Sequence, residues 1–204
     1  SVSNGKYTVT SSVKTIAKYA FAGCSTITEL TIPTNVEKLE ESAFNNVYNM
    51  TKLSFDEMSK VTTIDKSAFG WCQKLQQATL PSSLTEIGNI FTSCEKLEII
   101  NIPNNSKLKT IKKDAFKTNK KLKEFNFKGS CDLEKIEESA FYGLIELEKI
   151  VFPKTVSTIE KNAFAGCSKL KTAEFAADAV ITTIGQGAFA DCGLTSISIP
   201  KSIT

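Results

Sequence analysis

Two pairs of adjacent carboxylates are the first candidates for chemistry in this sequence. Glu40 and Glu41 form one pair, and Glu137 and Glu138 form the other. A carboxylate pair can supply the acid and the base of a glycosidase. Adjacent residues usually point apart, however, and each pair directly precedes a Ser-Ala-Phe turn. The two pairs are therefore poor acid and base pairs, and we expect no catalytic residues here.

The absence of histidine narrows the chemistry further. Histidine is the commonest general base, the usual partner of serine and cysteine nucleophiles, and a common zinc ligand. The six cysteines contain no Cys-x-x-Cys pair, the spacing typical of a zinc site. The sequence therefore predicts no metal, no cofactor and no enzyme activity.

Five of the six cysteines share one position of a repeated pattern, and we interpret them as small buried residues in a ladder. Strands of neighbouring repeats would lie about 4.8 Å apart. The pairs Cys72/Cys94 and Cys167/Cys192 could then also approach disulfide range. Cys131 lies in an insertion and is predicted to be the most exposed thiol. The five cysteines of the ladder are Cys24, Cys72, Cys94, Cys167 and Cys192.

The pattern that places these cysteines is built around the dipeptide Ala-Phe, which occurs seven times and once more as Ile-Phe. Successive copies are separated by 22 to 25 residues along the whole chain. A fixed period of this length is typical of a stacked-repeat solenoid. We expect the phenylalanines to form one buried column, made of Phe21, Phe44, Phe69, Phe91, Phe116, Phe141, Phe164 and Phe189.

Each repeat closes with an alternating apolar segment such as Leu122-x-x-Phe125-x-Phe127, the pattern of a half-buried strand. At the Ala-Phe dipeptide we expect a 3₁₀ or single helical turn. One residue is missing between Ile87 and Phe91, and another after Cys192, so we expect local distortions there. Longer connections should bulge from one face of the solenoid at 56–60, 104–107, 128–132 and 176–180.

Composition is that of a folded chain, with 41% apolar and 23% charged residues. The net charge of +3 gives no strong field for nucleic acid, and no apolar run is long enough to span a membrane. We expect one elongated, monomeric domain over residues 1–204. Residues 1–12 would be a partial repeat or cap, followed by about eight repeats over 13–204.

The repeat unit reads V-T-x-I-x-x-x-A-F-x-x-C-x-x-L-x-x-I-x-I-P, most clearly at 13–33 and 156–167. It resembles the leucine-rich repeats of the BspA type, also called the Treponema pallidum type. The resemblance covers residues 6–203. It implies an α/β repeat solenoid that is right-handed and curved, with a parallel sheet on the concave face. It also implies a secreted or cell-surface protein that adheres to host proteins or other cells, without a shared catalytic motif.

A lysine-rich segment is one candidate binding surface. Residues 107–128 hold nine lysines against Asp114 and Glu124. They could bind a sulfated glycan, an acidic host protein or an anionic surface, or simply form a solvated convex face. We favour the solvated face, because lysines spread around a coil do not all face one way. The candidate residues are Lys112, Lys113, Lys117, Lys120 and Lys121.

Trp71 is a second candidate, because other repeats carry Gly, Asn, Ser, Thr or Asp at its position. We expect it to be partly exposed. With Tyr48 and Tyr142 it could anchor a partner, or it could cover a gap in packing.

The outward column of the predicted concave sheet is a third candidate surface. Its residues are small or polar, so it could bind an extended partner, although it has no aromatic anchor. A neighbouring column would form an alternating charge ladder through Glu98, Lys123, Glu148 and Lys171. The candidate residues of the outward column are Thr79, Asn101, Asn126, Val151 and Glu174.

Two functional hypotheses follow. The first is a non-enzymatic surface or secreted module that binds a protein or glycan on host or neighbouring cells. The alternative is a structural spacer, a stalk segment of a longer surface protein that presents another domain.

Overall fold

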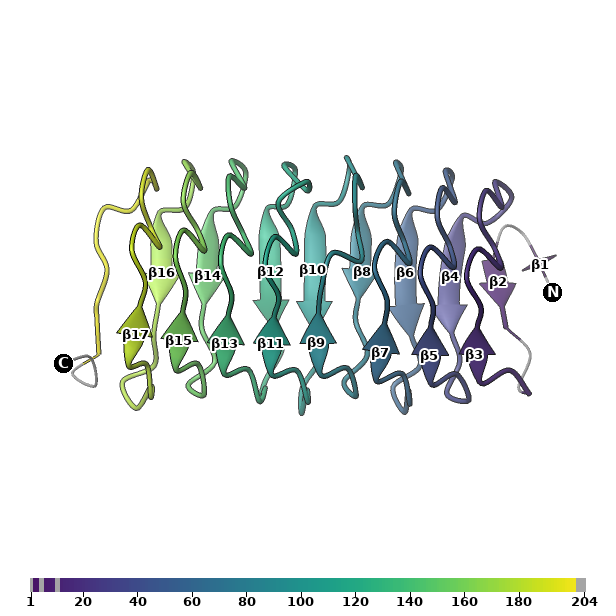
Figure 1. The fold of residues 1–204 in the computed structure, drawn as a ribbon, viewed down its shortest axis with the longest axis horizontal. Helices are drawn as coiled ribbons and strands as arrows, with labels where there is room; N and C mark the ends of the chain where they lie inside the picture. Colours follow the sequence, from purple (N-terminus) through teal and green to yellow (C-terminus); the bar gives the residue numbers. More distant parts are fainter. Residues whose placement is uncertain (1, 4–5, 10–11, 201–204) are drawn as a thin grey trace.

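The computed structural model describes residues 2–3, 6–9 and 12–200, which wind into a solenoid with two layers of strands (Figure 1). The larger layer is a nine-stranded sheet that takes one strand from each turn. Its strands are parallel except for the first pair, β1–β2, which is antiparallel. The strands are β1 (Val2–Ser3), β2 (Lys6–Thr8), β4 (Glu29–Ile32), β6 (Lys52–Phe55), β8 (Gln77–Thr79), β10 (Ile99–Ile102), β12 (Glu124–Phe127), β14 (Lys149–Val151) and β16 (Thr172–Glu174).

The second layer consists of two-residue strands that run opposite to those of the large sheet (Figure 1). Each of these strands contains the second aliphatic residue of its repeat. From the sequence we expected an apolar residue at this position, but we did not predict a strand there. One group is three-stranded and the other five-stranded. The strands are β3 (Thr15–Ile16), β5 (Lys38–Leu39) and β7 (Thr63–Ile64), then β9 (Glu86–Ile87), β11 (Thr110–Ile111), β13 (Lys135–Ile136), β15 (Thr158–Ile159) and β17 (Thr183–Ile184).

The register of the large sheet joins equivalent positions of successive repeats. Leu30 pairs with Leu53, and both side chains are buried between the layers. Thr31 pairs with Ser54, and both face outward. A slip of one residue would turn the apolar set to solvent, so burial holds the register. The predicted alternating strands are confirmed. The predicted partial repeat at 1–12 includes residues 1, 4–5 and 10–11, which lie outside the described residues.

The predicted phenylalanine column forms the centre of the core, but it divides between Phe91 and Phe116, and the end rings Phe21 and Phe189 are only partly buried. Neighbouring rings stack with centroid distances of 4.7 to 5.8 Å and interplanar angles of 5 to 25°. The adjacent alanine is small enough for successive turns to pack closely, and Ala43, Ala68 and Ala140 are fully buried. Ring burial of this kind contributes about 1.5–3 kcal/mol for each phenylalanine.

The expected helical or 3₁₀ turn at Ala-Phe is wrong, because the described residues contain no helix. Left-handed residues interrupt the turn, for example Ser42 (φ 57°) and Asn46 (φ 56°). The Phe44 N–H donates to the Ala68 carbonyl of the next repeat at 2.7 Å. A helix would use such donors within its own turn, whereas here they link one repeat to the next.

The solenoid is interrupted at the fourth repeat, where one residue is missing between Ile87 and Phe91. The second layer divides between β7 and β9. In the described part of the chain, ring contacts join Phe69 to Phe91 but not Phe91 to Phe116. The expected local distortion at this repeat is therefore confirmed. None of the described residues lies in a helix long and apolar enough to cross a bilayer.

We predict that Phe141→Ala lowers the free energy of unfolding by about 3–5 kcal/mol, because it leaves a cavity inside the stacked column. Phe141 is fully buried and stacks on Phe116 and Phe164. Phe21→Ala is the matched control, because Phe21 is only partly buried. Denaturant unfolding followed by circular dichroism measures both losses, and an equal loss would contradict the stacking account.

Candidate binding surfaces

The outward face of the large sheet carries the predicted column of small and polar residues. Asn101 pairs in register with Thr79 on one side and with Asn126 on the other, and Val151 pairs with Glu174. The structure therefore brings all five candidates into neighbouring strands. The Asn126 amide donates to Asn101 Oδ1 at 3.3 Å, so two residues of this column are hydrogen-bonded to each other.

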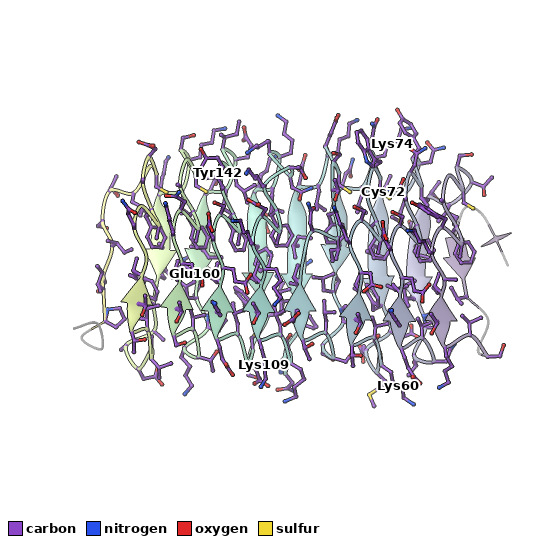
Figure 2. The ribbon with its side chains drawn as sticks, in the orientation of Figure 1. Lys60, Cys72, Lys74, Lys109, Tyr142 and Glu160 are labelled. Atoms are coloured by element: carbon purple, nitrogen blue, oxygen red, sulfur yellow. The ribbon has the colours of Figure 1, made fainter. Side chains whose placement is uncertain are left out.

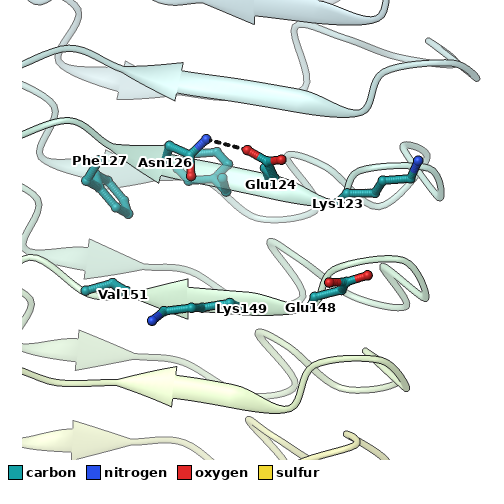
Figure 3. Close-up of a pocket in the computed structure, with 8 residues that line it drawn as sticks. Lys123, Glu124, Asn126, Phe127, Glu148, Lys149 and Val151 are labelled. Carbon is teal, nitrogen blue, oxygen red and sulfur yellow. Dashed lines mark hydrogen bonds between the residues drawn. The ribbon is translucent and has the colours of Figure 1, made fainter.

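The large sheet opens between β12 and β14. The register joins only Glu124 to Lys149, whereas four pairs join β10 to β12 and three join β14 to β16. The gap forms a cavity of about 430 Å³, which we call the β12–β14 opening. In Figure 3, residues of β12 and β14 face each other across it. Its lining residues are Lys123, Glu124, Phe125, Asn126, Phe127, Glu148, Lys149 and Val151.

We attribute the opening to the size of Phe125. Its ring packs edge-on against Phe116 at 5.3 Å and Phe141 at 5.1 Å, and lies 5.3 Å from Phe127. An aromatic ring needs more room under the sheet than an aliphatic side chain does. The same position in the other parallel strands from β4 to β16 holds Leu30, Leu53, Ala78, Ile100, Ile150 and Ala173.

The lysines at the β12–β14 opening have ion-pair partners, whereas the glutamates there have none among the described residues. Lys123 forms an ion pair with Glu98 at 3.1 Å, and Lys149 forms one with Glu174 at 2.7 Å. Both lysines are thus engaged by strands outside the opening. Glu124 accepts a hydrogen bond from Asn126 at 3.0 Å, and Glu148 has no ion-pair partner in the described part of the chain. Two carboxylates therefore border an opening whose apolar lining includes half-buried Phe127 and Val151, which is 47% exposed.

The lysine-rich segment does not form a surface of one sign. Six of its nine lysines pair with carboxylates, mostly from neighbouring repeats. Lys112 lies 3.1 Å from Glu86, and Lys113 lies 2.9 Å from Glu138; these contacts raise the pKa of both lysines. Salt bridges this exposed contribute little stability, so they mainly neutralise the surface. The other pairs are Lys107–Asp132, Lys109–Glu134, Lys117–Asp114 and Lys123–Glu98.

The remaining candidate lysines lie on the Ala-Phe side of the solenoid. Lys120 donates to the carbonyl oxygens of Tyr142 at 3.2 Å and Gly143 at 3.0 Å, and burial lowers its pKa. Lys121 has no ion-pair partner among the residues that the structure describes. In Figure 2, Lys74 and Tyr142 lie along one edge, whereas Lys60 and Lys109 lie along the opposite edge. The lysines of residues 107–128 are thus divided between the two edges.

The three candidate aromatic residues are exposed, but they do not form one group. Lys74 Nζ lies 5.1 Å from the Tyr48 ring centroid, and Lys117 and Lys120 lie 5.7 and 5.8 Å from that of Tyr142. Trp71 belongs to the repeat next to that of Tyr48. Tyr142 is three repeats further on, or about 14 Å away at ~4.8 Å per repeat.

The cysteine column has a role that we did not predict. The Cys94 thiol donates to the Phe69 carbonyl of the preceding repeat at 3.0 Å, and Cys167 donates to Phe141 at 3.1 Å. Asn119 replaces cysteine in one repeat, and its amide donates to the Phe91 carbonyl at 2.9 Å. Because an asparagine side chain is a hydrogen-bond donor, this replacement is the feature of the sequence that indicates a column of donors at this position. The same bond is made by Cys72 to Phe44 and by Cys192 to Phe164.

The prediction for Cys131 is wrong. Its side chain is only 5% exposed, and burial raises the pKa of its thiol. An isolated parallel bridge pairs Ser106 with Cys131, so the insertion is hydrogen-bonded to the preceding repeat. This pairing turns the Cys131 side chain inward. All six cysteines are free thiols.

Both carboxylate pairs bind the preceding repeat. Glu40 accepts the Lys18 backbone N–H at 3.0 Å, and Glu41 pairs with the Lys18 ammonium at 2.9 Å. Glu137 and Glu138 bind Lys113 in the same two ways. These carboxylates therefore link repeats. Within the described residues, no three side chains of the kinds that bind metals gather at one point.

A solenoid with one parallel core strand per repeat and a period of 22 to 25 residues defines a leucine-rich repeat protein. This chain belongs to the family described as the BspA type leucine rich repeat region. The family model matches residues 2–107 and 89–204, with six copies of the repeat.

Solved structures share the fold at low sequence identity. A leucine-rich repeat protein of T. pallidum is 21% identical, with 92% of this chain and 76% of that chain covered and a TM-score of 0.56. The pneumococcal vaccine antigen PcpA is 19% identical, with 97% and 67% covered and a TM-score of 0.53. No curated protein matches this chain.

The rate of thiol alkylation should differ among the cysteines according to their burial and pKa. The neighbouring Cys167 thiol lowers the pKa of half-buried Cys192, whereas burial raises the pKa of Cys94. A lower pKa gives more of the reactive thiolate at neutral pH. We predict that iodoacetamide labels Cys192 well before Cys94 and Cys131, as measured by peptide mass spectrometry. Equal labelling of Cys131 and Cys192 would contradict the burial described here.

Proposed function

We propose that this chain is a non-enzymatic binding module of a secreted or cell-surface protein. It would engage a protein on host or neighbouring cells through the β12–β14 opening. The single observation that carries this proposal is the break in the sheet, where two carboxylates border an apolar hollow. On the large sheet Lys123 and Lys149 pair with Glu98 and Glu174, whereas Glu148 at the opening has no ion-pair partner in the described part of the chain.

The chemistry of the opening favours a basic side chain. The aliphatic stem of a lysine or arginine would pack on Phe127 and Val151. Its cationic head would lie between Glu124 and Glu148, since Lys123 and Lys149 are held by outer strands. An extended segment carrying such a residue fits the sheet face, where side chains of successive strands present regular columns.

Two further observations support the proposal, one on the non-enzymatic role and one on the location. The carboxylate pairs that could have served catalysis are bound to lysines of neighbouring repeats. One structure of the same fold is a vaccine antigen, which supports a surface location for this chain as well.

A spacer is the alternative, and the ion-pair ladders favour it. Carboxylates and lysines of successive repeats neutralise one another, as in Lys14–Glu37 and Lys154–Asp178. Such a surface promotes solubility and offers few sites for a partner. In this case the chain would present another domain and bind no ligand itself.

Charge reversal at the opening tests the proposal. We predict that Glu148→Lys weakens binding to a basic protein ligand at least tenfold, equivalent to about 1.4 kcal/mol. The matched control is Glu57→Lys, an exposed position in the 56–60 connection. Both variants would be compared with the parent chain on immobilised basic extracellular-matrix proteins across a salt series.

Binding at the opening should fade as salt rises, because exposed charges are screened. An equal effect of both substitutions would show that general charge, not the opening, carries the binding. Failure of the parent chain to bind any probe at any salt would favour the spacer.

A further inference from the structure

Trp71 is a bulky residue in a backbone conformation that the turn imposes on most repeats. Its φ is +58°, in the left-handed region that favours glycine. The equivalent residues with a positive φ are glycine or small polar residues, namely Gly23, Asn46, Ser93, Gly143, Gly166 and Asp191. A non-glycine residue there costs about 1–2 kcal/mol. The indole is 48% exposed, so burial offsets only part of that cost. Strain retained at an exposed aromatic residue points to a binding role.

Gly70, which precedes Trp71, leaves room for the Asn45 side chain. A Cβ at Gly70 would stand 2.8 Å from Asn45 Nδ2 and 3.0 Å from Ser67 Cβ, so any other residue would displace that amide. Gly70 does not have a positive φ, so its backbone conformation does not require glycine. The space of about 350 Å³ bounded by Trp71, Asn45 and Asn46 is named here the Trp71 hollow.

The two asparagine side chains supply hydrogen-bonding groups to this hollow. In the described part of the chain, neither side-chain amide has a hydrogen-bond partner. Asn49 and Asn119, by contrast, donate to backbone carbonyls at 2.8 and 2.9 Å. Each free amide offers an acceptor oxygen and a two-hydrogen donor. None of the three lining side chains carries a charge.

We propose that the Trp71 hollow binds a neutral sugar ring of a glycan. The apolar C–H face of a pyranose would lie on the indole, and its hydroxyls would exchange hydrogen bonds with Asn45 and Asn46. An aromatic platform with a few placed polar groups is the common composition of a small-ligand site. The hollow lies in the Ala-Phe turns, apart from the β12–β14 opening, so this inference stands independently of the proposed function.

Trp71 is the only tryptophan, so its fluorescence reports on the site directly. The probes are the methyl glycosides of glucose, galactose, mannose and N-acetylglucosamine, with their short oligomers, at up to tens of millimolar. We expect a saturable spectral shift with at least one of them. Gly70→Ala keeps the tryptophan but displaces the Asn45 amide from its place in the hollow, and it should weaken that binding at least tenfold. Tyr142→Ala, which removes an exposed aromatic residue elsewhere, should leave the affinity unchanged.

A second substitution separates binding from stability. Trp71→Gly restores the residue of three other repeats, so it should retain or raise the melting temperature while abolishing sugar binding in calorimetry. A lower melting temperature would show that Trp71 is a packing residue and would overturn the inference. The absence of a saturable shift with every sugar, or undiminished binding by Gly70→Ala, would overturn it as well.

Discussion

Hydrogen bonds from each repeat to the next are the constraint on which the rest of this structure depends. They run through the large sheet, the two-residue strands and the Ala-Phe turns. Because each repeat is too thin to bury its own apolar face, it is stable only when its neighbours hold it in register. The stacked phenylalanines and the cysteine thiols extend this linkage into the core, where four thiols donate to a phenylalanine carbonyl of the preceding repeat.

The same register governs the surface. Positions that align between repeats bring lysines opposite carboxylates, and six of the nine lysines of residues 107–128 are neutralised, mostly in this way. Features able to recognise a partner then arise where a repeat departs from the pattern. Phe125 separates two strands of the sheet, and Gly70 with Trp71 leaves a hollow in the turns. The first departure involves one residue and the second two adjacent residues, and a regular solenoid tolerates both because its other ladders remain intact.

The periodic parts of this account could be predicted from sequence, because a repeated position has a repeated environment. The phenylalanine column, the alternating strands and the outward column are of this kind. The expected helical turn was wrong, because the turn donates its N–H groups to the next repeat. Cys131 was misplaced because a bridge to Ser106, 25 residues earlier, turns it inward. The β12–β14 opening depends on how Phe125 packs against Phe116 and Phe141, which spacing alone does not convey.

The central claim is that the inter-repeat ladder is continuous except at particular repeats, and that one interruption opens the sheet at β12–β14. Amide hydrogen exchange, resolved by NMR, measures this most directly. We predict that the amides of Phe127 and Val151, whose N–H groups point across the β12–β14 opening, exchange markedly faster than those at equivalent positions in β4 and β10. Uniform protection along the whole sheet would show that the ladder is closed at this point, and would contradict the account.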